Sequence, residues 1–164
     1  MRILGIDPGY GITGFGLIET QKGQSRLLQC GAITTPAGMD FSARLEIIYE
    51  DMRKLLEVSK PDAVAIEELF FGQNVTTGIG VAQSRGVILL AIRQAGLTVT
   101  SYKPAQIKQA LVGYGNASKH QMQDMTKRIL HLESMPKPDD AADAIAIALC
   151  HARSSTSLLA QMRK

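Results

Sequence analysis

Four carboxylates occupy positions where acidic side chains could act together. Asp7 follows a short apolar run and precedes a Pro-Gly turn, and Glu67 ends a second apolar run. Asp140 and Asp143 are three residues apart at the start of a helical pattern, so they project from one face of its first turn. Such carboxylates would repel one another and favour a hard dication, Mg²⁺ or Mn²⁺ rather than Zn²⁺. Two such ions could promote hydrolysis of a phosphodiester.

Each of these acids also has a purely structural interpretation. Asp7 before Pro-Gly is typical of a turn residue, and Glu67 with Glu68 could be a solvated pair at a strand end. Asp139 and Asp140 could be helix N-terminal acids that the helix dipole favours, and Asp139 competes with Asp140 for the role beside Asp143.

Positive charge is concentrated in the middle of the chain. The whole chain has a net charge of +3, but residues 70–132 contain seven Lys and Arg against Asp124 alone. A basic zone of this kind attracts a polyanion, and it agrees with phosphodiester chemistry on a nucleic acid.

The elements that must position these residues follow from hydrophobic periodicity and turn signals. Asp40 or Ser42 could cap the first helix, Ser118 a later one, and Pro138 opens the last. Strands are predicted over 2–7, 12–19, 26–34, 62–67 and 97–102, and helices over 41–56, 79–95, 104–111, 118–132 and from 138. The order predicts one α/β domain over residues 1–153, with a mixed sheet of three antiparallel strands and then parallel strands, flanked by helices. Residues 154–164 lack periodicity and are predicted to form a mobile tail.

A GxGxxG pattern at Gly9, Gly11 and Gly14 does not predict a dinucleotide site, because a strand-like run follows it where that fold needs a helix. The same loop could wrap phosphates as in sugar kinases and actin-like ATPases. Those proteins need two such lobes, and 164 residues hold one, so an ATP-dependent phosphotransferase is a remote alternative.

The remaining composition indicates a cytoplasmic protein. Cys30 and Cys150 lie inside apolar runs, which favours two core thiols in a reducing compartment over a disulfide. Neither a membrane span nor a signal peptide is predicted from the apolar segments.

Five ordered motifs carry a resemblance to a known family. They are IDPGYGITGFG at 6–16, AIEELF at 65–70, AQSRGV at 82–87, QIKQALVGYGNASK at 106–119 and DDAADAIAIA at 139–148. In order and spacing they resemble the RuvC family of bacterial Holliday junction resolvases. The resemblance implies an RNase H-like fold, a homodimer and an endonuclease of DNA recombination and repair. It further implies paired Mg²⁺-dependent nicks in four-way junction DNA that leave 5′-phosphate and 3′-hydroxyl ends.

The resemblance also assigns the acids. Asp7, Glu67, Asp140 and Asp143 match the family's ligands for two Mg²⁺ ions, with Mn²⁺ as a substitute. The DAADA string selects Asp140 rather than its neighbour, and Glu67 directly follows the Ala-Ile pair as the family's acid does.

Further residues are implied to contact DNA. Lys108 and Lys119 match basic residues near the cleaved strand, where an ammonium would offset charge on the scissile phosphate. Phe70 matches an aromatic that stacks on an unpaired base, although Phe71 beside it could be the one that points outward. His120 adjoins Lys119 and is a candidate phosphate contact.

The helix predicted over 79–95 is apolar on nearly all sides, so it needs burial on more than one face. It is the candidate core of a two-fold dimer interface, and Val87 and Leu90 are the positions to test. Arg85 could lie at the edge of this helix and face DNA. The alternative is that the helix simply covers the sheet.

Two alternative functions belong to other classes. The RuvX/YqgF group, which is linked to ribosomal RNA processing, shares a DPG-type opening but not the DAADA pattern. A non-catalytic junction-binding protein would have lost acids, whereas all four are present. The family also implies the branch-migration proteins RuvA and RuvB as partners.

Overall fold

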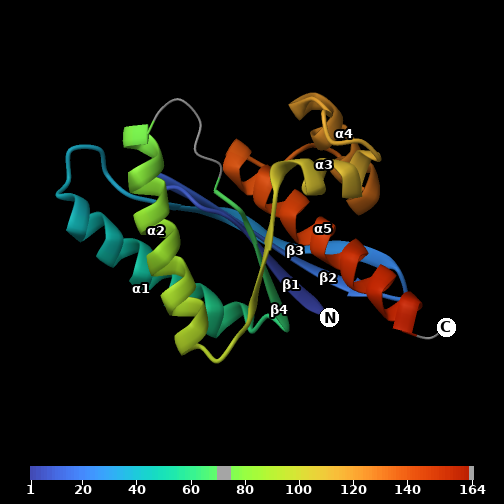
Figure 1. The fold of residues 1–164 in the computed structure, drawn as a ribbon, viewed down its shortest axis with the longest axis horizontal. Helices are drawn as coiled ribbons and strands as arrows, with labels where there is room; N and C mark the ends of the chain where they lie inside the picture. Colours follow the sequence, from blue (N-terminus) through green and yellow to red (C-terminus); the bar gives the residue numbers. More distant parts are fainter. Residues whose placement is uncertain (70–74, 163–164) are drawn as a thin grey trace.

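The first strand lies in the middle of the sheet in this computed structural model. The structure describes residues 1–69 and 75–162, and the side chains of residues 1–69 and 77–155. Five strands lie in the order β3-β2-β1-β4-β5 (Figure 1). They are β1 Arg2–Asp7, β2 Ile12–Gln21, β3 Gln24–Thr34, β4 Ala63–Glu67 and β5 Val99–Tyr102.

Strand directions confirm the predicted mixed sheet. β1, β2 and β3 pair antiparallel in succession, whereas β4 pairs parallel with β1 and β5 pairs parallel with β4. Ile6 is the partner of Ile66 in the β1–β4 register. The next residues, Asp7 and Glu67, therefore reach the same edge of the sheet, where parallel strands finish.

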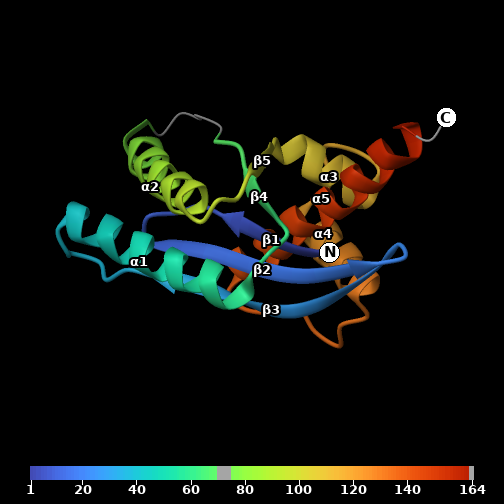
Figure 2. The same cartoon turned by 90° about the horizontal axis from the view of Figure 1, so that it is seen from below.

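The helices form two groups on opposite faces of the sheet, as Figures 1 and 2 both show. They are α1 Phe41–Ser59 and α2 Val75–Gln94 in one group, and α3 Pro104–Val112, α4 Lys119–Leu130 and α5 Asp139–Met162 in the other. Strand alternation divides the core accordingly. Leu4 and Ile6 of β1 belong to the cluster that includes α1 and α2, whereas Ile3 belongs to the cluster that includes α5.

Side-chain caps explain where two helices begin. The carboxylate of Asp40 accepts hydrogen bonds from the backbone N–H groups of Ser42 and Ala43, so Asp40 rather than Ser42 caps α1. Ser118 forms a capping box with Gln121 at the start of α4, as the sequence predicted. These caps fix the ends of helices that approach the carboxyl edge of the sheet.

Helix α5 lies unusually close to the sheet because the facing positions are glycines. A Cβ atom on Gly5 would lie 2.0 Å from the carbonyl oxygen of Ala144, and one on Gly16 would lie 2.8 Å from the backbone nitrogen of Ile145. Gly5 and Gly16 are partners in the β1–β2 register. A pair of glycines thus leaves room for the helix backbone itself.

The last helix extends further than predicted. The sequence predicts a mobile tail without periodicity from residue 154, and α5 continues to Met162. The side-chain oxygen of Ser155 donates to the carbonyl of His151 one turn earlier, so this serine satisfies its hydrogen bond without leaving the helix. Among the helices that the structure describes, none is long and apolar enough to cross a membrane.

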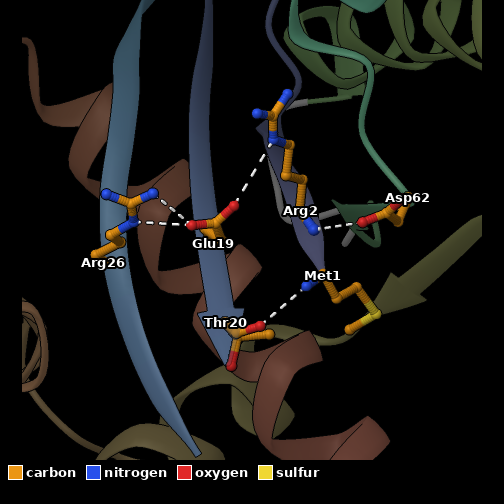
Figure 3. A network of polar contacts seen from close by, with 6 residues as sticks. All are labelled: Met1, Arg2, Glu19, Thr20, Arg26 and Asp62. Carbon is orange, nitrogen blue, oxygen red and sulfur yellow. Dashed lines mark hydrogen bonds and ion pairs between the residues drawn. The ribbon is translucent and has the colours of Figure 1, made fainter. Parts of the chain in front are cut away.

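The opposite edge of the sheet, where β1 begins, is held by paired polar groups (Figure 3). The N-terminal ammonium donates to the carbonyl of Thr20 at 2.9 Å. The backbone N–H of Arg2 donates to Asp62 at 2.6 Å, and Arg26 donates to Glu19 at 2.6 Å and 2.8 Å.

Candidate active site

Asp7 is positioned by a tight loop between β1 and β2. The hydroxyl of Thr13, which is fully buried, donates to the carbonyl of Gly9 at 2.5 Å and closes the loop. A Cβ atom on Gly9 would lie 2.2 Å from the carbonyl oxygen of Ile12, so only glycine fits this turn. The glycine-rich loop therefore serves to place the half-buried Asp7 at the end of β1.

Asp7 lies beside the start of α5. Its partner across the β1–β2 ladder is Gly14. A Cβ atom on Gly14 would lie 2.0 Å from the carbonyl oxygen of Asp140, so the first turn of α5 rests directly on this glycine. This contact brings the acids of the last helix to the carboxyl edge of the sheet.

Glu67 occupies the equivalent position at the end of β4. Alternation places it on the α5 side together with the buried Ala65, while Ile66 faces α1 and α2. Glu68 is exposed, and its backbone N–H donates to the carbonyl of Tyr102 at 2.8 Å. Of the two neighbouring glutamates, Glu67 is thus the one on the side of the other acids.

The first turns of α5 present three acids, and Lys119 lies against two of them. The Lys119 ammonium is 3.0 Å from Asp139 and 3.5 Å from Asp143. Asp140 is half-buried beside them. Asp139, which the motif comparison set aside as a ligand, therefore forms an ion pair with a residue of the site.

Burial and like charge oppose ionisation of these acids. Desolvation by burial and the nearby charges of Glu67, Asp143 and Asp140 raise the pKa of Asp7 to about 7, against a smaller opposing effect of Lys119. Burial, followed by the charge of Asp143, raises the pKa of Glu67. Burial is also the main cause of the raised pKa of Asp143. The arrangement therefore disfavours the charged state of several acids at once, which a bound cation would reverse.

A small cavity of about 220 Å³ opens beside the acids. Glu67 and Asp143 line it together with Lys108 and Lys119, and the charge of Lys108 acts to lower the pKa of Glu67. The rest of its lining is apolar and consists of Pro104, Ile107, Met122, Ala146 and Ile147. The two predicted lysines thus share one cavity with two of the predicted carboxylates.

The donor set fits a hard divalent cation, although the side chains as they lie do not enclose one. Within residues 1–69 and 77–155, no three His, Cys, Asp or Glu side chains are close enough to form a metal site. Asp7, Glu67, Asp140 and Asp143 nevertheless interact electrostatically at one edge, and all offer oxygen. Oxygen ligands with concentrated negative charge suit Mg²⁺ or Mn²⁺.

The three other residues predicted to contact DNA differ in where they lie. Phe70, with its alternative Phe71, lies outside the described residues. His120 is exposed on the first turn of α4, next to Lys119. Arg85 is half-buried, and its guanidinium donates to the Glu67 carbonyl and to the hydroxyl of Ser101.

Sequence reasoning missed the positioning role of the glycines. Gly5, Gly14 and Gly16 all lie under α5. In the sequence, Gly14 was considered only as part of the GxGxxG pattern and Gly16 only as part of a predicted strand. The sequence does contain a signal for this role. Glycines alternate along β2, and the last helix, which carries the acids, is rich in alanine. Two small surfaces of this kind allow a helix backbone to approach a sheet.

Comparison with known proteins identifies the relatives of the chain. The family model described as crossover junction endodeoxyribonuclease RuvC matches residues 3–151. The curated RuvC of Chloroflexus aurantiacus is 52% identical over 158 residues, which cover 96% of each chain. The RuvC of Heliobacterium modesticaldum is 53% identical over 156 residues, covering 95% of this chain and 96% of the relative.

A solved structure agrees with both sequence comparisons. RuvC from Thermus thermophilus in complex with a Holliday junction substrate superposes with a TM-score of 0.90, at 36% identity over 94% of each chain. The similarity confirms the RNase H-like fold.

Proposed function

The chain belongs to the RuvC family of crossover junction endodeoxyribonucleases, and from this we propose that it resolves four-way DNA junctions by paired, symmetric nicks that require Mg²⁺. Each nick leaves a 5′-phosphate and a 3′-hydroxyl end. The reaction belongs to homologous recombination and DNA repair.

The convergence of acids from three separate elements is the observation that carries this proposal. Asp7 comes from β1, Glu67 from β4, and Asp140 with Asp143 from α5. Burial, and after it the repulsion between these acids, raises the pKa values of Asp7, Glu67 and Asp143. Half-buried acids that repel one another reduce stability, so a ligand that binds them is the physical reason to assemble them.

These four residues are the proposed ligands of two Mg²⁺ ions. When bound, the ions would activate a water molecule for attack on a phosphodiester and stabilise charge on the leaving oxygen. The carboxylates themselves provide the negative charge and oxygen donors, and the cavity beside Glu67 and Asp143 provides access from the protein surface.

Lys108 and Lys119 are proposed to hold the scissile strand. Both line the cavity with Glu67 and Asp143, so a phosphate that enters it meets two ammonium groups. Lys119 pairs with Asp139 and Asp143 in the protein alone, which keeps its charge at the site. Exposed His120 next to it supplies a further phosphate contact.

Phe70 is proposed to stack against an unpaired base at the junction, a role that rests on its place directly after the AIEEL motif. Phe70→Ala should weaken junction binding more than Phe71→Ala. Fluorescence of a 2-aminopurine base at the crossover, which stacking quenches, separates the two residues. A larger effect at Phe71 would assign the role to that residue.

The active species is proposed to be a two-fold dimer formed through α2. The inner side of this helix buries Ile88 and Ile92, whereas Ile79 and Leu90 are about half exposed, at 52% and 51%. Large exposed apolar side chains on one helix favour association, and a C2 dimer presents two identical sites to two symmetric strands. Leu90→Glu should shift the sedimentation profile toward monomer, with Glu57→Gln on α1 as control; an unchanged profile would contradict this interface.

RuvA and RuvB are proposed as partners that move the junction to the enzyme, and the cytoplasm as the place of action. Both follow from family membership. Addition of RuvA and RuvB should increase junction cleavage by the wild-type protein, and no increase would argue against the partnership.

The deciding experiment compares a mobile four-way junction with a linear duplex of the same sequence, with and without Mg²⁺. Wild type and Asp7→Asn are assayed beside Glu19→Gln, which alters an acid at the other edge of the sheet. We expect symmetric, ligatable nicks in the junction alone, absent without Mg²⁺ and in Asp7→Asn but retained in Glu19→Gln. Nicking by Asp7→Asn would refute the role of Asp7, and junction binding without nicking by wild type over several sequences would indicate a binding module.

A further inference from the structure

We propose that Arg85 is a positioning residue for cleavage, because its guanidinium ties the end of β4, and with it Glu67, to helix α2. The inference rests on the proposed function, since it concerns the placement of one of the proposed metal ligands. It differs from the sequence prediction, in which Arg85 faces DNA.

Two hydrogen bonds place the guanidinium across the ends of two parallel strands. Its Nε donates to the carbonyl oxygen of Glu67 at 3.2 Å, and its Nη2 donates to the hydroxyl of Ser101 at 2.8 Å. Ser101 is the register partner of Ile66 on the neighbouring strand β5. One side chain on α2 therefore holds both β4 and β5 at the edge where the acids gather.

The contact acts on Glu67 through its backbone. The Glu67 carboxylate lies on the α5 side of the sheet, whereas its carbonyl is reached from α2, which covers the other side. The other polar group of the same peptide is also bonded, because the N–H of Glu68 donates to the carbonyl of Tyr102 at 2.8 Å. With both of its polar groups bonded, the peptide that follows Glu67 has little freedom to rotate, which limits the directions in which the Glu67 side chain can leave the strand.

Helix α2 also abuts the loop that follows Asp7. A Cβ atom on Gly80 would lie 3.0 Å from the ring of Tyr10, so the helix and this loop are in close contact at this glycine. The Tyr10 ring is held in turn by the edge of Phe41 and by the guanidinium of Arg44, which lies 4.8 Å from its centre. The helix proposed for the dimer thus contacts the ends of both strands that carry acids, and Arg85 provides the polar part of that contact.

Arginine suits this position better than lysine. A planar guanidinium offers several N–H donors in a fixed fork and can serve two acceptors in different directions. A lysine ammonium at the same position is a single centre on a flexible stem. Arg85→Lys should therefore keep the positive charge while losing the simultaneous hold on Glu67 and Ser101.

The test measures single-turnover cleavage of a junction at saturating protein, together with junction affinity in the absence of divalent ions. The variants are Arg85→Lys, Arg85→Met and Ser101→Ala, with Arg93→Met on the exposed last turn of α2 as control. We expect both Arg85 variants to slow cleavage about 10- to 100-fold and to need more Mg²⁺ for half-maximal rate, as for residues that orient metal ligands. Ser101→Ala should give a smaller loss in the same direction, and Arg93→Met none.

A double variant separates positioning from a direct DNA contact. Arg85→Met combined with Ser101→Ala should be no slower than Arg85→Met alone, because the serine acts through the arginine. Junction affinity and its salt dependence should match wild type. Weakened affinity for Arg85→Lys and Arg85→Met, with an unchanged saturated rate and unchanged Mg²⁺ requirement, would overturn the proposal and assign Arg85 to DNA.

Folding and the proposed function are checked separately. Thermal melting of each variant identifies a general loss of structure, and Arg85→Lys and Ser101→Ala then carry the test if Arg85→Met does not fold. If wild type itself does not cut junctions in Mg²⁺, the proposed function fails. If wild type cuts and all the Arg85 and Ser101 variants cut equally fast, only the positioning role fails.

Discussion

Acidic side chains have different surroundings at the two edges of the sheet, where β1 finishes and where it begins. Where β1 and β4 finish, Asp7 and Glu67 are half-buried and meet further carboxylates from α5. Where β1 begins, Glu19 accepts two hydrogen bonds from Arg26 and lies 3.9 Å from the guanidinium of Arg2 (Figure 3). At the first edge carboxylates lie near one another as well as near Lys119, whereas at the second edge Glu19 lies between two guanidinium groups.

The pKa values follow the same division. Burial and neighbouring carboxylates raise the pKa of Asp7 to about 7, whereas the hydrogen bond from Arg26 lowers the pKa of Glu19. Ionisation of Asp7 therefore weakens the fold, and ionisation of Glu19 strengthens it. The acids at the carboxyl edge therefore lower the stability of the fold, a cost that the other edge does not bear and that a bound cation would offset.

The largest effect is expected at Asp7. Burial raises its pKa from the ordinary 3.8 to about 7, which corresponds to a penalty of about 4 kcal/mol for the ionised carboxylate in the folded state. Asp7→Asn should therefore raise the free energy of unfolding at pH 8 by about 4 kcal/mol, although it should abolish cleavage. Urea denaturation of both proteins measures the difference.

The dependence of the free energy of unfolding on pH tests the direction of this effect. The folded protein binds a proton at Asp7 more tightly than the unfolded chain, so wild-type stability falls as the pH rises from the ordinary pKa of 3.8 through about 7. The advantage of Asp7→Asn should be full above this range and vanish below it. A variant that is less stable than wild type at pH 8 would break the proposed contrast between the two edges.

The next effect is expected where α5 touches the sheet. Gly14→Ala places a Cβ atom 2.0 Å from the carbonyl oxygen of Asp140, a backbone atom that can yield only if the helix moves. We expect a loss of about 1–3 kcal/mol, as for overpacked cores, together with slower cleavage because Asp140 and Asp143 shift. Gly86→Ala is the control, since a Cβ atom there meets nothing within 4 Å. Equal stability of Gly14→Ala and wild type would show that α5 does not rest on this glycine.

Sequence alone could place the acids at strand ends and at a helix start, because these places depend on local pattern. Asp7 and Glu67 end apolar runs, and Ser118 and Pro138 mark helix starts, so the strand ends and helix starts could be read along the chain. The parallel pairing of β4 with β1 then brings the first two acids to one edge. The resemblance to the family supplied the choice among neighbouring acids.

Other features of the site depend on distances between helices and strands, and hydrophobic periodicity carries no information about these distances. The pattern places Arg85 on a helix but does not reveal that the carbonyl of Glu67 lies within reach of it. The glycines of β2 were interpreted by their spacing along the chain, whereas their role depends on a helix more than a hundred residues later. The serine-rich segment after Arg153 lacks periodicity and was not predicted as part of the helix, yet α5 continues through it.

A smaller effect is expected from Mg²⁺ itself. If the ion binds the folded carboxylates, wild type should gain about 1.4 kcal/mol at a concentration ten times the dissociation constant. Glu19→Gln should gain the same amount, and Asp7→Asn and Glu67→Gln much less. Thermal melting with increasing Mg²⁺ at pH 8 measures these shifts without substrate, and equal shifts in all four proteins would place the ion elsewhere.

The smallest effect on stability is expected at Glu19, at the edge of the sheet where β1 begins. Glu19→Gln removes a partly exposed ion pair, so it should lower the melting temperature slightly and leave cleavage unchanged. Because the folded pKa of Glu19 is lowered, the wild-type advantage should be present at neutral pH and disappear as the pH falls below the ordinary value of 4.5. It should also shrink at about 1 M NaCl, where such pairs are screened.

A slower reaction in Glu19→Gln would mean that the two edges are coupled along β1 and β2. The site would then depend on the charge pairs of the far edge as well as on the contacts of α2 and α5. Unchanged cleavage with the expected loss of stability would instead show that one sheet keeps its structural charges and its functional charges at opposite ends. The far edge could then be altered for stability without a loss of cleavage.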